Sequence, residues 1–206
     1  VVAAGITMGL TTACSGVLAR MGSRIEARNG TPAPASTLSD GHDAGHVIIA
    51  GFGRIGQAIG GLLEERRIPY IALDLDPHAV SRARKLGQAV HYGDVRRSDV
   101  LKNANAADAR AIVLTMDKPA ANAAVIAALH HLGITTPVVA RARDKANAKE
   151  LYALGANEVV LEAFEASLQM GEETLVALGF PREAAHAVIA EQREDGRRDL
   201  AEAAGR

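Results

Sequence analysis

Short runs of apolar residues recur along the chain from position 46 onward, with stretches of helical pattern between them. Each run has four or five residues, mostly β-branched or aliphatic, which is typical of strands that are buried on both faces. Strands that alternate with helices pair in parallel through right-handed crossovers, so we expect an α/β fold with a doubly wound parallel sheet of about six strands. The predicted strands are Val47–Ala50, Tyr70–Leu73, Ala89–Tyr92, Ala111–Leu114, Pro137–Ala140 and Glu158–Leu161.

The stretches between the strands have the spacing of amphipathic helices. Asp76 is placed to cap one of them, and Pro77 suits its first helical position because proline needs no hydrogen-bonded N–H there. After the last strand the pattern is only helical, and we expect the charged segment from Gln192 onward to fray. The predicted helices are Gln57–Arg67, Pro77–Leu86, Pro119–Leu132, Asp144–Leu154, Phe164–Leu178 and Arg182–Arg193.

The first residues have the pattern of a membrane segment. Positions 1–19 carry no charge, and a helix of that length spans about 28 Å, close to the thickness of a bilayer core. Arg20, Arg24 and Arg28 follow, and by the positive-inside rule they place everything after them in the cytoplasm. We expect residues 1–20 to be the end of a transmembrane helix in an inner (plasma) membrane. A signal peptide or an ordinary buried helix is the alternative.

The segments that follow suggest three further parts of the chain. Asn29–Gly45 is rich in Gly, Pro, Ala and Ser and has no periodicity, so residues 21–45 are interpreted as a flexible linker. A long ordered loop is the alternative interpretation. Residues 46–161 hold the predicted sheet, and residues 162–206 form a helical segment with a charged tail. Because the chain begins at Val1 rather than Met, we expect it to be a piece of a longer protein.

Charge and composition exclude several classes of function. The chain has 206 residues with 23 Lys+Arg against 24 Asp+Glu, and this balance argues against nucleic acid as a partner. Three Phe, three Tyr and no Trp leave little material for stacking on bases or sugars. The single cysteine, Cys14, rules out an internal disulfide framework.

The segment Gly51–Gly56 (GFGRIG) is the most informative motif. It directly follows a predicted strand and directly precedes a helix, which is the context that gives the pattern GxGxxG its meaning. The first glycine permits a tight turn, the second lets the backbone approach a pyrophosphate, and the third lets helix and strand pack closely. The helix start then offers free N–H groups to phosphates. We therefore expect the sheet to be Rossmann-like and to bind a nucleotide.

An acidic residue accompanies the glycine motif. Asp74 directly follows the C-terminal end of the second predicted strand, 18 residues after Gly56, where a carboxylate accepts hydrogen bonds from ribose hydroxyls. The same charge repels a 2′-phosphate, and Leu75 to Pro77 supply no arginine to offset it. The expected ligand is therefore NAD(H), or AMP or ATP, rather than NADP(H). The alternative role for Asp74, capping the next helix, suits Asp76 better.

Residues at the ends of the other strands are expected to line the same crevice. Asp94 is placed to receive an adenine amino group, although it could instead be a helix cap. Arg141 could likewise be an ordinary surface charge. The candidate binding residues are Gly51, Phe52, Gly53, Arg54, Ile55, Gly56, Asp74, Leu75, Asp94, Thr115, Met116 and Arg141.

The sequence contains no convincing catalytic set. Asp74, Arg96 and Ala156 follow the three tyrosines at the position where a Tyr-x-x-x-Lys dehydrogenase needs lysine. The 45 residues after Leu161 are too few for an ordinary substrate domain. The histidines and Cys14 form no metal-binding or nucleophilic pattern. We expect a binding domain rather than an enzyme, with a soluble NAD-dependent oxidoreductase as the less favoured alternative.

Several motifs together resemble a known family. The runs HVIIAGFGRIGQAIG, YIALDLDP, HYGDVRRSDVLKNA, AIVLTMDKP, PVVARARD and LGANEVVLEAFEASLQMG are similar to the C-terminal nucleotide-binding domain of Kef-type potassium/proton antiporters, in the cation:proton antiporter family. This domain type is called RCK or KTN and is of TrkA-N type. The resemblance covers about residues 46–180, and its combination of motifs is more specific than any one of them.

The resemblance implies a regulatory domain that gates potassium efflux in exchange for protons. Members dimerise through a helix that Glu162–Met170 resembles, so a homodimer is expected, together with an antiporter domain upstream. Some members bind glutathione adducts through an arginine that matches Arg141, but their other glutathione contacts have no clear match here. The alternatives are an RCK domain of a potassium channel or of a Trk-type uptake system.

Overall fold

The computed structural model describes residues 45–203 and Gly205, all of which belong to one compact unit, Thr37–Arg206. Six strands in this part of the chain form a single sheet in the order β3-β2-β1-β4-β5-β6, and every neighbouring pair is parallel. The predicted Rossmann-like α/β fold is confirmed. The strands are β1 (Val47–Ala50), β2 (Tyr70–Asp74), β3 (Val90–Tyr92), β4 (Ala111–Leu114), β5 (Val138–Ala142) and β6 (Glu158–Leu161).

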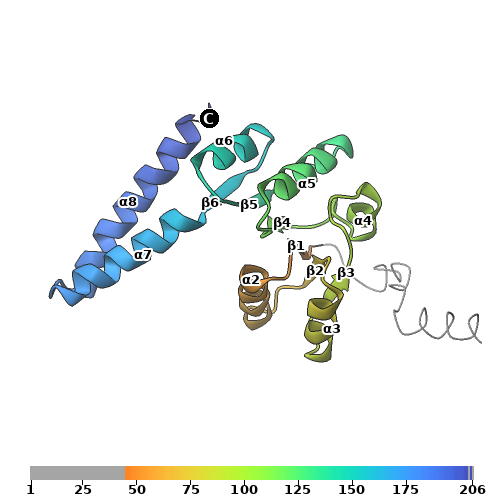
Figure 1. Ribbon diagram of the computed structural model, residues 1–206, viewed down its shortest axis with the longest axis horizontal. Coiled ribbons are helices and arrows are strands. Elements are labelled where there is room, and N and C mark those ends of the chain that lie inside the picture. Colours follow the sequence, from red (N-terminus) through yellow and green to blue (C-terminus); the bar gives the residue numbers. More distant parts are fainter. Residues whose placement is uncertain (1–44, 204, 206) are drawn as a thin grey trace, which may run out of the picture. The chain divides into compact units, whose positions relative to one another are not determined.

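Helices cover the two faces of this sheet unequally (Figure 1). The first two helices pack on one face, and the next three pack on the other, because the chain reverses its direction of travel between β3 and β4. The last two helices form a hairpin that follows β6. The helices are α2 (Arg54–Glu65), α3 (Pro77–Lys85), α4 (Ser98–Asn103), α5 (Pro119–His131), α6 (Lys145–Ala153), α7 (Glu162–Ala177) and α8 (Arg182–Ala203).

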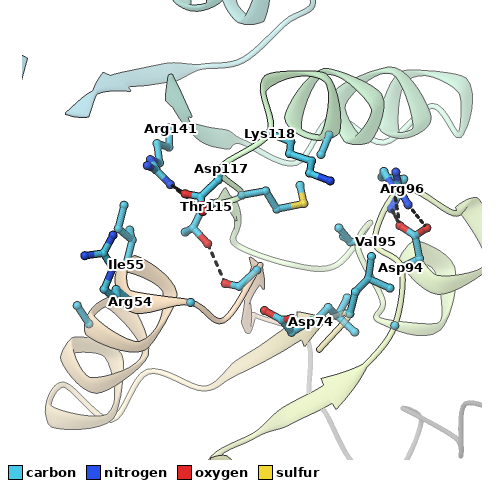
Figure 2. Close-up of a pocket in the computed structure, with 18 of the residues that line it drawn as sticks. Arg54, Ile55, Asp74, Asp94, Val95, Arg96, Thr115, Asp117, Lys118 and Arg141 are labelled. Atoms are coloured by element: carbon cyan, nitrogen blue, oxygen red, sulfur yellow. Dashed lines mark hydrogen bonds and ion pairs between the residues drawn. The ribbon is translucent and has the colours of Figure 1, made fainter. Parts of the chain in front are cut away.

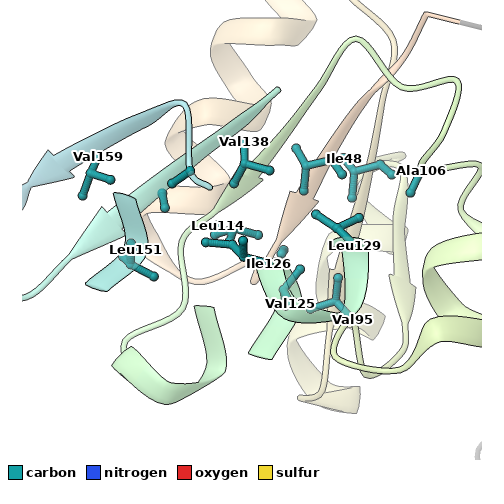
Figure 3. Packing of buried hydrophobic residues seen from close by; sticks show 14 of the residues in the cluster. Ile48, Val95, Ala106, Leu114, Val125, Ile126, Leu129, Val138, Leu151 and Val159 are labelled. Atoms are coloured by element: carbon teal, nitrogen blue, oxygen red, sulfur yellow. The ribbon is translucent and has the colours of Figure 1, made fainter. Parts of the chain in front are cut away.

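The larger apolar cluster lies between the sheet and helices α4, α5 and α6 (Figure 3). Ile48, Ile112 and Leu114 are fully buried in it, and Leu129 and Leu151 pack on them from the helices. Truncating such a side chain to alanine costs about 2–5 kcal/mol, because a cavity remains. The burial of central strands on both faces explains why their sequences are almost entirely apolar.

Two helices begin with an aspartate cap, and the first of these caps, Asp76, is the one that the sequence predicts. Asp76 accepts a hydrogen bond from the His78 N–H at the start of α3, and Pro77 occupies the first helical position. Asp144 accepts from the Asn147 N–H at the start of α6. Each cap satisfies an N–H group that has no partner inside its helix. Both helix starts lie at the carboxyl edge of the sheet.

The charged tail differs from the expectation. Helix α8 continues to Ala203, so the prediction that the chain frays from Gln192 is wrong. Leu200 is buried in the larger apolar cluster, and Arg193 forms an ion pair with Glu165 of α7 at 2.9 Å. Gly196 lets the Phe164 ring lie against the α8 backbone, where a Cβ would be 2.5 Å from the ring. Tertiary packing therefore extends a helix that a charged sequence does not predict.

None of the helices that the structure describes combines the length and the apolar character needed to cross a bilayer. The predicted membrane segment 1–20 and the linker 21–45, apart from Gly45, lie outside the described residues.

Candidate functional site

A cleft of about 670 Å³ opens at the carboxyl edge of the sheet (Figure 2). It lies where β1 is flanked by β2 on one side and β4 on the other, so the chain connections leave these strands in opposite directions. Ligands of open α/β sheets bind at such a switch point, because the diverging loops leave a crevice there. The topology alone therefore places a binding site beside the glycine motif.

The three glycines of the motif differ in their steric surroundings. Gly51 has φ +96°, which side chains rarely adopt, and a Cβ there would be 2.9 Å from Thr115 Oγ1. A Cβ on Gly56 would lie 2.2 Å from the Gly51 carbonyl oxygen, so this glycine lets α2 pack against the turn. A Cβ added to Gly53, in contrast, would have no atom within 4 Å. Its bare backbone is therefore accessible to a ligand in the cleft.

Helix α2 starts at the floor of the cleft without a side-chain cap. Gly53 is its N-cap residue and makes no side-chain hydrogen bond, in contrast to Asp76 at α3 and Asp144 at α6. Helices α4, α5 and α7 also start without a side-chain cap. The N–H groups of the first turn and the positive end of the helix dipole are left for an anion. Arg54 and Ile55 of this turn line the cleft.

Asp74 lies across from this turn at the end of β2. One carboxylate oxygen accepts a hydrogen bond from the Phe52 N–H at 2.5 Å, and the other accepts from the Asp76 N–H at 2.8 Å. These two bonds fix the carboxylate against the glycine loop, and its two oxygens retain further acceptor capacity. Asp74 is therefore a pre-oriented acceptor within the cleft.

A second acid lies beyond the end of β3. Asp94 accepts hydrogen bonds from Arg96 Nε at 2.8 Å and Nη2 at 2.7 Å, and from the Arg96 backbone N–H at 3.1 Å. These bonds to Arg96 hold the pKa of Asp94 below its usual value, although partial burial opposes the shift. The carboxylate stays ionised, and both residues line the cleft.

The opposite wall carries an ion-pair cluster centred on Arg141 of β5. Its guanidinium bonds to Asp117 after β4 and to Glu162 at the start of α7, with Nε 2.7 Å from the Glu162 carboxylate. Partial burial alone would lower the pKa of Arg141, but these two carboxylates hold it above its usual value. Arg141 therefore links the cleft wall to the helical hairpin.

The structure brings most of the predicted binding residues to the cleft, with two exceptions. The Phe52 ring is fully buried and stacks near Tyr70, so only its N–H faces the site. Gly56 is buried beneath the turn. Thr115 lines the cleft, but its hydroxyl lies 2.8 Å from the Gly51 carbonyl oxygen and 3.1 Å from that of Ala50, so its one hydrogen is used to support the loop. The predicted residues that line the cleft are Gly51, Gly53, Arg54, Ile55, Asp74, Leu75, Asp94, Thr115, Met116 and Arg141.

Sequence reasoning missed four charged residues of the cleft: Arg96, Asp117, Lys118 and Glu162. Each lies one to three residues from a predicted position at a strand end, so extending every strand end by a few residues would have included them. Among the described residues, no group of three His, Cys, Asp or Glu side chains could hold a metal ion.

Comparison with known proteins places this geometry in a family. The TrkA-N domain family matches residues 47–162, which include the whole sheet. A protein of Alkalimonas amylolytica, named as the K(+) efflux antiporter KefB, is 36% identical over 148 residues. That match covers 72% of this chain but only 22% of the relative, so the chain spans about a fifth of that protein.

Solved structures are similar over most of the described residues. The C-terminal domain of Kef from Shewanella denitrificans, in an AMP-bound form, is 31% identical with a TM-score of 0.68, and covers 78% of this chain and 98% of that one. The GsuK channel bound to NAD is 24% identical with a TM-score of 0.62, and covers 73% of this chain and 27% of that one. The GsuK match supports the fold alone.

Proposed function

The chain belongs to the TrkA-N domain family as a domain of the Kef C-terminal type, and we propose that its cleft binds an adenine nucleotide and thereby regulates an attached potassium-transport protein. The observation that carries this proposal is the Asp74 carboxylate, held by the Phe52 N–H opposite the uncapped start of α2. A carboxylate in this place binds ribose, and a free helix start binds phosphate. The AMP-bound form of the 31% identical Kef domain supports the same ligand class.

Each part of the nucleotide has a candidate partner in the cleft. In our proposal the phosphates lie against Gly53 and the first turn of α2, and Arg54 and Lys118 add positive charge at the cleft walls. Asp74 accepts the ribose hydroxyls. Asp94 lies at the adenine end, where its carboxylate retains acceptor capacity beside Arg96.

The charge of Asp74 selects among adenine nucleotides. A 2′-phosphate placed on the ribose would meet this carboxylate, which already accepts two backbone hydrogen bonds. We therefore propose NAD(H), AMP or ATP as ligands and exclude NADP(H). Among these, the AMP-bound relative favours the mononucleotide.

We propose a regulatory role without catalysis. In support of this, the described residues after β6 form a two-helix hairpin rather than a substrate domain. The charged side chains Arg96, Asp117 and Arg141 are engaged in ion pairs, whereas a proton-transferring group must be available to substrate. A ligand of such a domain acts by binding one arrangement of the protein more tightly than another.

The attached protein is, in our proposal, a potassium/proton antiporter of an inner membrane, with this domain on its cytoplasmic side. The KefB relative supports this, although the chain spans only 22% of its length. Gating by ligand would pass from the cleft through Arg141, which bonds to Glu162 at the first turn of α7.

We further propose that α7 and the following turn bind a second copy of the chain. Met170 and Leu178 are each 72% exposed and Phe180 is 53% exposed, and apolar side chains that are this exposed mark association surfaces when they cluster. Glutathione is the proposed second regulator. A neighbouring pocket of about 540 Å³ contains Arg141 and Arg143, which suit the carboxylates of a short peptide.

The nucleotide proposal is tested by calorimetric titration of residues 37–206 with AMP, NADH and NADPH. We expect AMP and NADH to bind and NADPH to bind at least about tenfold more weakly, since one unfavourable charge contact costs about 1.4 kcal/mol or more. The absence of binding by both AMP and NADH at millimolar concentration would overturn the proposal. Consumption of NADH with a small carbonyl compound would instead identify an oxidoreductase.

A further inference from the structure

Basic side chains gather at the amino edge of the sheet, on the side away from the cleft. The helices run antiparallel to the strands, so the connections before β2, β3 and β4 all lie at this edge. Backbone hydrogen bonds join these connections to their neighbours: the Pro69 carbonyl accepts from the Val47 N–H of β1, and the Ala89 carbonyl accepts from the Ala72 N–H of β2. The Arg110 N–H likewise donates to the His46 carbonyl, just before β1. Six cations lie in these connections or in the last two residues of the helices before them. These residues, called the basic edge below, are Arg66, Arg67, Arg84, Lys85, Lys102 and Arg110.

The positive charges of the basic edge are not neutralised by ion pairs within the described residues. All six side chains are exposed, and none of them forms an ion pair within the described part of the chain. The same stretches contain three acids, Glu64, Glu65 and Asp108, and Glu64 accepts a hydrogen bond from the Tyr70 hydroxyl at 2.6 Å. Residues 162–203, in contrast, contain ten acids and four arginines. Positive charge is therefore concentrated on this edge of a chain whose formal net charge is −1.

An exposed apolar side chain lies within the basic edge. Leu86 follows Arg84 and Lys85 directly and is 79% exposed, the highest value among the large apolar residues in the described ranges. Leu62, one turn before Arg66, is 53% exposed. Cations beside a protruding leucine are the combination that binds the interface of an anionic bilayer, where charge meets headgroups and the apolar group enters the boundary.

Helix stabilisation accounts for only part of this pattern. Arg84 and Lys85 occupy the last turn of α3, where cations interact favourably with the helix dipole. Arg110 lies outside any helix, and Arg67 has φ +55° in the turn beyond α2. The dipole also gives no reason for an exposed leucine. A common partner outside the described residues explains all of these features together.

The chain enters its described part at this same edge. The Gly45 N–H donates to the Asp108 carbonyl at 3.1 Å, in the connection that carries Arg110. Upstream, the sequence predicts a membrane segment over residues 1–20 and a Gly/Pro/Ala/Ser-rich tether, Asn29–Gly45. Such a short tether keeps a weakly binding surface at high effective concentration near a bilayer.

We infer that the basic edge docks onto the anionic headgroups of a lipid bilayer. Phosphate oxygens of the headgroups take the place of the missing ion-pair partners, and Leu86 enters the interface. The carboxyl edge with its cleft then faces away from the bilayer and stays open to solutes. This inference does not depend on nucleotide binding.

Sedimentation of residues 37–206 with vesicles tests it. Vesicles of phosphatidylcholine with about 30% phosphatidylglycerol should bind the protein at low salt, while pure phosphatidylcholine should not. The double variant Arg84→Gln/Lys85→Gln should bind about 25-fold more weakly, since each cation near such a surface contributes about fivefold. Leu86→Ser should weaken binding several-fold and leave the thermal midpoint unchanged, because the side chain is exposed.

The matched control is Lys145→Gln/Lys149→Gln, which removes the same charge from exposed positions on α6. It should change vesicle binding by less than about threefold, since these lysines lie outside the basic edge. If both double variants lose the same affinity for the anionic vesicles, the effect depends on net charge alone and the inference is overturned. Equal binding of the wild type to neutral and anionic vesicles would also overturn it. If the basic edge binds an acidic protein surface instead, the domain stays in the supernatant with both kinds of vesicle, which also overturns it.

Discussion

Replacing Asp74 by alanine removes two interactions at once, and the structure separates them. In the free protein the carboxylate accepts the N–H groups of Phe52 and Asp76, at 2.5 and 2.8 Å. In the nucleotide complex that we propose, it also accepts the ribose hydroxyls. Asp74→Ala should therefore weaken both folding and ligand binding, by amounts that can be estimated independently.

The loss of folding stability comes mainly from the Phe52 N–H, which has no carboxylate partner in the variant. This residue is fully buried. A hydrogen bond to a charged group contributes about 1.5–3 kcal/mol, and water that enters the cleft recovers part of it, so we expect a loss of about 1–2 kcal/mol in the free energy of unfolding. For the ligand, loss of the charged acceptor should weaken AMP binding about 10- to 100-fold.

Urea unfolding measures the loss of folding stability, and calorimetric titration with AMP measures the loss of affinity, both on the same variant. The matched control is Asp108→Ala, an exposed acid at the amino edge of the sheet, which should change neither quantity. A variant that loses stability as estimated but binds AMP with unchanged affinity would show that Asp74 only supports the loop. That result would refute the assignment of the ribose to Asp74.

Three further outcomes follow from the packing and the charges. Gly56→Ala should lower the free energy of unfolding by about 1–3 kcal/mol in urea titrations, because its Cβ would lie 2.2 Å from a carbonyl oxygen. Arg96 holds the pKa of Asp94 below the usual 3.8, so the pair stabilises the fold above that pH, and the stabilisation is lost as the pH falls through the lowered pKa. The stability difference between wild type and Arg96→Ala should therefore shrink as the pH falls below 3.8. Gly196→Ala should speed hydrogen exchange in α8 without changing AMP affinity, because the new Cβ collides with Phe164.

The strands were predictable because each is buried on both faces and therefore apolar throughout. Val47–Ala50 and Glu158–Leu161 have the predicted bounds. Helix α2 starts three residues earlier than predicted, since the glycine motif itself forms the first helical turn. The short helix Ser98–Asn103 was missed, because six residues are too few to show a helical period.

The candidate site was predictable to the level of backbone position. A residue at the end of a parallel strand reaches the carboxyl edge whatever its type, which is why Asp74 and Asp94 lie in the cleft as expected. Side-chain partners were not predictable in this way. The pairing of Arg141 with Glu162 joins residues on different elements, and the inward direction of the Phe52 ring depends on its contact with Tyr70.

The central claim is that an adenine nucleotide binds between the start of α2 and Asp74. Titrating the ¹⁵N-labelled domain with AMP while recording amide shifts tests it most directly. We predict the largest shifts at Gly53, Arg54 and Asp74, because these residues line the cleft. Shifts confined to α7 and α8, with the glycine loop unaffected at saturating AMP, would contradict it.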